Sequence, residues 1–95
     1  MEDFKKIILF GAGEIGKQAL YYWGTEHVHC FVDNSAAKVG TTVEGIPVIS
    51  FSALKKIYVD FRLVITVDPK KYFVLAAQLD DAGISDYTPF LKSPG

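Results

Sequence analysis

The feature that most constrains this chain is a glycine-rich turn that joins a short apolar run to an amphipathic segment. Residues 7–10 (Ile-Ile-Leu-Phe) are continuously apolar, and residues 11–16 (Gly-Ala-Gly-Glu-Ile-Gly) follow with the pattern G-x-G-x-x-G. Apolar side chains then recur at helical spacing up to Trp23, before Gly24 supplies a stop. An apolar strand that turns through such glycines into a helix is typical of a parallel sheet covered by helices on both faces.

Further short apolar runs predict the other strands of this sheet. They lie at residues 28–32, 47–49, 62–67 and 86–90. The segment between Gly40 and Gly45 is expected to be a loop.

Helical patterns separate these strands. A short helix is expected after a cap at Ser50 or Ser52, and a longer one begins at Asp68-Pro69 and ends at Gly83. Strands that alternate with helices form βαβ units. The sequence therefore predicts an α/β fold: a three-layer, Rossmann-like open parallel sheet of about five strands in the order 3-2-1-4-5.

Composition limits the function classes. The 95 residues are 49% hydrophobic and 22% charged, which predicts that residues 1–95 form a single globular domain. A formal net charge of -1 supplies no general field for nucleic acid or an anionic membrane, so neither is an expected partner. Cys30 is the only cysteine, and no apolar run is long enough for a transmembrane segment. A cytoplasmic location is therefore expected.

The glycine positions have separate roles in binding a nucleotide. Gly11 makes the tight turn, Gly13 lets a diphosphate approach the backbone, and Gly16 lets the helix pack closely on the strand. The alternative is a purely structural turn. Asp33 favours binding, because it ends the next strand about 20 residues further on, where an acid accepts the hydroxyl groups of a ribose.

Neighbouring residues complete the predicted cofactor site. Glu14 and Ile15 open the helix, and Asn34 follows the predicted ribose ligand. Glu14 is expected to face solvent, because a carboxylate pointing inward would repel a phosphate. Thr66 lies at the carboxyl end of the strand at residues 62–67, where it is placed to contact ribose or base. Lys17 is either solvated or in contact with a phosphate.

The acid at position 33 also predicts which cofactor is preferred. No arginine directly follows Asp33, and the first positive charge beyond it is Lys38. A carboxylate without a nearby arginine disfavours a 2′-phosphate. A cofactor with a free 2′-hydroxyl, such as NAD, is therefore expected to bind better than NADP. Asp68 is interpreted as the cap of the following helix.

Metal and catalytic sites are not predicted. His27 and His29 are expected to share one strand face with Cys30 pointing away, and no second pair of ligands accompanies them. The sequence contains no arrangement that identifies a nucleophile or an acid–base pair, so catalytic residues stay unassigned.

Four segments carry a resemblance to known proteins: residues 8–16, 31–34 (Phe-Val-Asp-Asn), 38–40 (Lys-x-Gly) and 45–48 (Gly-Ile-Pro-Val). Together they resemble the N-terminal Rossmann nucleotide-binding modules of bacterial polysaccharide and sugar-nucleotide enzymes. These enzymes include nucleoside-diphosphate-sugar epimerases and dehydratases and sugar acetyltransferases. The resemblance implies NAD, or a nucleotide-sugar such as a UDP-sugar, as the ligand.

The resemblance also implies that catalytic residues lie in a following domain. The main hypothesis is a nucleotide-binding module in bacterial polysaccharide or sugar-nucleotide metabolism, either free-standing or the N-terminal part of a longer protein. The alternative is a small NAD-dependent oxidoreductase or epimerase, completed by a homodimer partner or a fused catalytic domain. A third hypothesis is a regulatory domain that keeps the fold but has lost the phosphate site. For this chain alone, binding without catalysis is expected.

Overall fold

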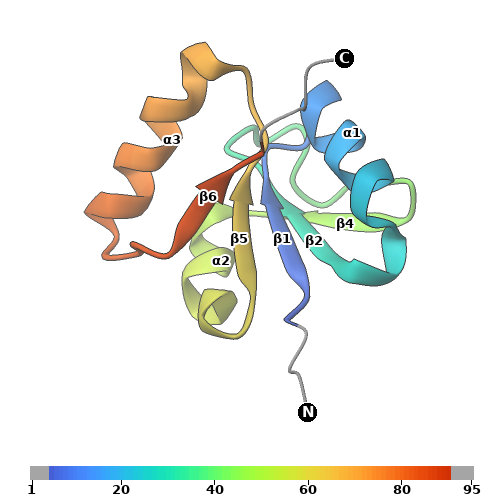
Figure 1. The fold of residues 1–95 in the computed structure, drawn as a ribbon, viewed down its shortest axis with the longest axis horizontal. Coiled ribbons are helices and arrows are strands. Elements are labelled where there is room, and N and C mark those ends of the chain that lie inside the picture. The colour runs from blue at the N-terminus through green and yellow to red at the C-terminus, as the bar shows by residue number, and fades with distance from the viewer. Residues whose placement is uncertain (1–4, 91–95) are drawn as a thin grey trace.

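The central strand of the sheet is β1 (Ile7–Phe10), whose four residues are all buried. It pairs in parallel with β2 (Val28–Val32) on one side and with β5 (Arg62–Ile65) on the other. This computed structural model describes residues 5–90. The three longest apolar runs of the sequence therefore lie side by side at the centre, as expected (Figure 1).

Within residues 5–90, the sheet has six strands in the order β3-β4-β2-β1-β5-β6. The outer strands are β3 (Thr42–Val43), β4 (Ile46–Ile49) and β6 (Tyr87–Pro89). The five predicted strands follow the predicted order and are parallel to one another. The sheet departs from the expected open parallel sheet of about five strands in one respect, because β3 is an additional edge strand antiparallel to β4.

This additional strand lies in the segment between Gly40 and Gly45, which is expected to be a loop from the sequence. The sequence does not reveal the strand, because the turn that follows it has an unusual composition. Val43 pairs with Ile46, so only Glu44 and Gly45 connect β3 to β4. Both residues have positive φ angles, 51° and 83°, which is the conformation of a two-residue hairpin turn. Asn or Asp normally marks such a turn, and Glu at its first position conceals the hairpin in the sequence.

Helices cover both faces of the sheet and give the expected three layers (Figure 1). The helix α1 (Glu14–Trp23) packs Ala19 and Leu20 on one face, against Leu9 and Phe31. The opposite face is covered by α2 (Phe51–Ile57) and α3 (Pro69–Asp81).

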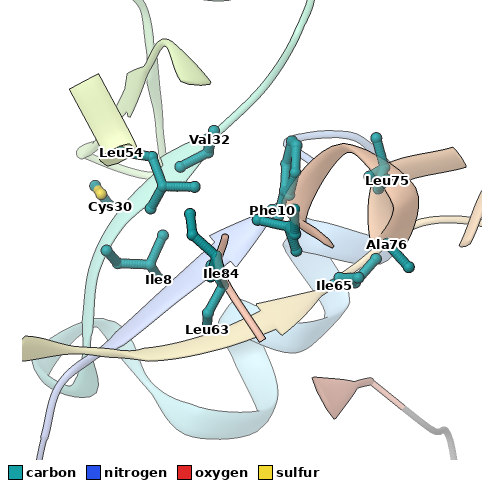
Figure 2. Packing of buried hydrophobic residues seen from close by; sticks show 11 residues of the cluster. Ile8, Phe10, Cys30, Val32, Leu54, Leu63, Ile65, Leu75, Ala76 and Ile84 are labelled. Atoms are coloured by element: carbon teal, nitrogen blue, oxygen red, sulfur yellow. The ribbon is translucent and has the colours of Figure 1, made fainter. Parts of the chain in front are cut away.

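The core beneath α2 and α3 is the larger of the two (Figure 2). Ile8 and Phe10 of β1 lie among side chains from both helices, including Leu54 of α2 and Leu75 of α3. Since alternate residues of β1 face opposite layers, this one strand joins the two cores.

Side chains cap two of the three α-helices at their N-termini. Ser50 rather than Ser52 caps α2, because its hydroxyl accepts a hydrogen bond of 3.1 Å from the Ala53 N–H. Asp68 caps α3 as expected, by accepting one of 3.0 Å from the Lys70 N–H. The N-cap residue of α1 is Gly13, which has no side chain that could accept a hydrogen bond from the first turn of the helix.

Two short 3-10 turns, η1 (Thr25–His27) and η2 (Tyr58–Asp60), precede β2 and β5. None of the helices in residues 5–90 combines the length and the hydropathy that a membrane span requires.

Candidate functional site

A cleft of about 830 Å³ opens where β1, β2 and β5 end. Its walls include the last residue of β1, Phe10, and the residues that directly follow the other two strands, Asp33 and Thr66. Open α/β sheets bind ligands at the carboxyl ends of adjacent parallel strands. The site lies where the chain crosses to opposite sides of the first strand. The remaining lining residues are Gly11, Gly13, Glu14, Ile15, Asn34, Ser35, Lys38, Val67, Asp68, Lys71, Val74 and Leu75.

Two of the three motif glycines are required by the packing of the protein itself. Gly11 has a φ of +127°, and a Cβ on it would lie 2.5 Å from the Thr66 carbonyl oxygen. A Cβ on Gly16 would lie 2.1 Å from the Gly11 carbonyl oxygen. Both distances are far too short for non-bonded atoms. The helix–strand packing role predicted for Gly16 therefore has a direct steric reason. This residue is buried and is not among those that line the cleft.

Gly13 has no comparable internal reason to be glycine. Its backbone is extended, with φ of −93°, a conformation that other residues adopt readily. A Cβ built on Gly13 would meet only the Lys38 Nζ, at 3.7 Å, which is an ordinary contact. Of the three glycines, Gly13 is thus the one that leaves room for something outside the fold.

The Asp33 carboxylate braces the glycine turn. Its Oδ2 accepts a hydrogen bond of 2.9 Å from the Ala12 N–H, and its Oδ1 accepts one of 2.8 Å from the Ser35 N–H. The side chain is therefore held between the turn and its own loop. An ionised carboxylate has about four lone-pair positions, so two bonds leave it able to accept others from a ligand.

Thr66 holds the same turn from the other side. Its side chain is 2% exposed, and its hydroxyl donates a hydrogen bond of 2.8 Å to the Gly11 carbonyl oxygen. The Gly11 N–H in turn donates one of 2.7 Å to the Val32 carbonyl oxygen. Thr66 lies at the predicted place, and its hydroxyl is directed at the protein's own backbone.

The other residues that the sequence predicts for the cofactor site, Glu14, Ile15 and Asn34, also line the cleft. Glu14 is exposed and Ile15 is half-buried at the start of α1. Asn34 exchanges two hydrogen bonds with Gln78 of α3, of 2.8 and 3.0 Å between the side-chain amides. This amide pair joins the loop after β2 to α3, whose residue Val74 lines the cleft.

The structure also adds cleft residues that sequence reasoning missed. Lys38 and Lys71 bring two ammonium groups to the cleft, and Val74 brings an apolar side chain that is 67% exposed. The Lys38-x-Gly40 segment was singled out only as part of a resemblance. Lys17 does not line this cleft. It lines a smaller, adjoining hollow of about 370 Å³ between α1 and the β3–β4 hairpin, which shares Gly13 and Glu14 with the cleft.

The histidine and cysteine residues do not converge. His27 lies in η1 rather than in β2, so the expectation that it shares a strand face with His29 is wrong. The His29 ring stacks on Phe61 with 4.4 Å between the centroids. Cys30 is buried, and burial raises the pKa of its thiol to about 11. Residues 5–90 contain no group of three His, Cys, Asp or Glu side chains placed to hold a metal ion.

Comparison with known proteins gives a family and a fold. The family model described as C2185-like, N-terminal, matches residues 3–90. No curated protein sequence is significantly similar to the chain. Among solved structures, a UDP-D-quinovosamine 4-dehydrogenase from Vibrio fischeri is similar, with a TM-score of 0.66 and 22% sequence identity over 90% of this chain and 78% of that chain.

A second similar structure is RSP, a Rex-family repressor, with a TM-score of 0.70 and 19% identity. The match covers 95% of this chain and 48% of the repressor, so the chain spans about half the repressor's length. RSP in complex with β-NADH is also similar, with a TM-score of 0.67, 19% identity and coverage of 95% of this chain and 49% of that one. These likenesses show a Rossmann-like fold.

The contrast between Gly16 and Gly13 predicts losses of stability of different size for the same substitution. Gly16→Ala should lower the free energy of unfolding by about 1–3 kcal/mol or more, because the new methyl group meets the Gly11 carbonyl. Gly13→Ala should change it by less than about 1 kcal/mol. Urea denaturation followed by circular dichroism measures both. Equal losses would contradict the assignment of Gly13 as the open position.

Proposed function

We propose that this chain, which belongs to the C2185-like N-terminal family, is a nucleotide-binding module whose ligand lies in the cleft at the ends of β1, β2 and β5. NAD is the ligand we favour, with a nucleotide-sugar such as a UDP-sugar as the other member of the same class. Both contain a diphosphate, a ribose and a base, and the cleft offers a place for each.

The observation that carries this proposal is the difference among the motif glycines. The fold requires Gly11 and Gly16, whereas Gly13 lines the cleft and meets nothing closer than the end of a lysine side chain. A diphosphate that lies against the backbone needs this kind of open position. The N–H groups of the first turn of α1 face no capping side chain there, so a phosphate can accept from them.

The other parts of the cleft support the same ligand class. Asp33 keeps acceptor capacity for ribose hydroxyls next to the turn that it braces. Beyond it, Val74 and Leu75 of α3 present apolar surface at which the flat face of a base can be placed. Thr66 contributes by positioning the turn, and Glu14, Ile15 and Asn34 border the ligand.

The proposed biological setting is bacterial polysaccharide or sugar-nucleotide metabolism in the cytoplasm. A UDP-sugar dehydrogenase is among the proteins with a similar fold, and a similar Rex-family repressor has been solved with β-NADH. We assign binding rather than catalysis to this chain. A fused catalytic domain or a homodimer partner would then supply the chemistry.

The most direct mutational test is Gly13→Val. A branched side chain at this position would occupy the space that the diphosphate needs, so binding of NAD should be lost. Isothermal titration calorimetry of the wild type and the variant with NAD and with a UDP-sugar measures the effect. Circular dichroism and thermal melting control for folding. Unchanged affinity in a folded variant would refute the phosphate-cradle role of Gly13.

A second test concerns the ribose. NAD should bind at least about tenfold more tightly than NADP, because like charges about 4 Å apart repel by roughly 1–4 kcal/mol between water and the protein surface. Asp33→Ser should reduce this preference. The measurement is the ratio of the two dissociation constants at one ionic strength.

The bracing role of Asp33 requires a separate readout for the same variant. Loss of the hydrogen bond to Ala12 should also lower the free energy of unfolding, by about 1–3 kcal/mol. If stability falls while the NAD-to-NADP ratio stays the same, Asp33 is only a brace and does not contact the ribose.

A further inference from the structure

The loop after β2 holds Lys38 at a fixed place beside the glycine turn. The Lys38 N–H donates a hydrogen bond of 3.0 Å to the Ser35 carbonyl oxygen. The Lys38 carbonyl oxygen accepts two, of 3.0 Å from the Thr41 N–H and 2.6 Å from the Thr41 hydroxyl. Gly40 then bonds to Val48 of β4, with 2.9 Å between its nitrogen and the carbonyl oxygen. The backbone of Lys38 is thus anchored to the sheet.

From this anchored position the side chain reaches the open glycine. Lys38 Nζ is the atom nearest to the place where a Gly13 Cβ would be, at 3.7 Å. Both residues line the cleft. The ammonium therefore lies over the one part of the glycine turn that the fold leaves free, although 25 positions separate the two residues along the sequence.

The charged side chains that line the cleft determine what the Lys38 ammonium beside Gly13 can do for an anionic ligand. Three carboxylates line it, from Glu14, Asp33 and Asp68, against the ammonium groups of Lys38 and Lys71. The cleft as a whole is therefore slightly acidic and does not attract a phosphate group by its summed charge. A cation at the point of closest approach is needed to offset the local carboxylates.

We propose that the Lys38 ammonium is the direct counter-ion of the ligand's diphosphate and makes this cleft selective for diphosphate-bearing ligands. The proposal rests on the proposed nucleotide-binding function and adds to it the residue that recognises the charge. Charge-assisted hydrogen bonds from an ammonium to phosphate oxygens are among the stronger polar contacts in proteins. Lys38 therefore selects NAD or a nucleotide-sugar over a nucleoside that has the same base and ribose.

The test compares three variants by calorimetric titration with NAD. Lys38→Met should weaken binding by at least about tenfold, because it removes the ammonium and keeps most of the apolar stem. Lys38→Arg should keep affinity within about threefold of the wild type, because it keeps the positive charge. Lys70→Met, an exposed lysine outside the cleft lining, controls for net charge and should stay within about twofold.

Salt dependence distinguishes a charge effect from a structural one. Affinity of the wild type for NAD should fall as sodium chloride rises, and Lys38→Met should show a flatter dependence. Equal affinities of Lys38→Met and wild type, or equal losses in Lys38→Met and Lys70→Met, overturn the proposal for Lys38 while NAD binding by the wild type still supports the proposed function. Absence of NAD and UDP-sugar binding by the folded wild type overturns both.

Discussion

The glycine turn is held from both neighbouring strands, and the site depends on this arrangement. On the β2 side, the Gly11 N–H bonds to Val32 and the Ala12 N–H bonds to the Asp33 carboxylate. On the β5 side, the buried Thr66 hydroxyl donates to the Gly11 carbonyl. These bonds fix the backbone just before Gly13. The protein's own hydrogen bonds therefore hold the position that faces the cleft, which would lower the ordering cost of the proposed nucleotide binding.

Much of the fold could be predicted because a few segments have an unambiguous pattern. Residues 7–10 and 28–32 are short apolar runs with clear stops, and both match β1 and β2 residue for residue. The strand predicted at residues 62–67 ends earlier, at Ile65, although the Thr66 N–H still donates a hydrogen bond of 2.9 Å to the Phe10 carbonyl oxygen of β1. Helix boundaries were signalled by Gly24 at one end of α1 and by Asp68-Pro69 at the start of α3.

The parts that escaped prediction are one local turn of unusual composition and several contacts between distant residues. The β3–β4 hairpin turns through Glu44, whose positive φ no sequence rule favours. Lys38 looks like a solvated loop residue until the loop is seen to fold toward Gly13. The pairing of Asn34 with Gln78 joins positions 44 residues apart. Asp33 was predicted as a ribose ligand, and its brace to Ala12 could not be seen without the folded turn.

The account is tested most directly by mapping where NAD binds on the folded chain. In a titration followed by ¹⁵N–¹H correlation spectra, saturable shifts should concentrate in the backbone amides of residues 10–15, 33–38 and 66–75, which contain the cleft lining. Amides of α2 and of the β3–β4 hairpin should change little. Shifts confined to those distant segments, or none at saturating NAD and UDP-sugar, would contradict the assignment of the cleft as a nucleotide site.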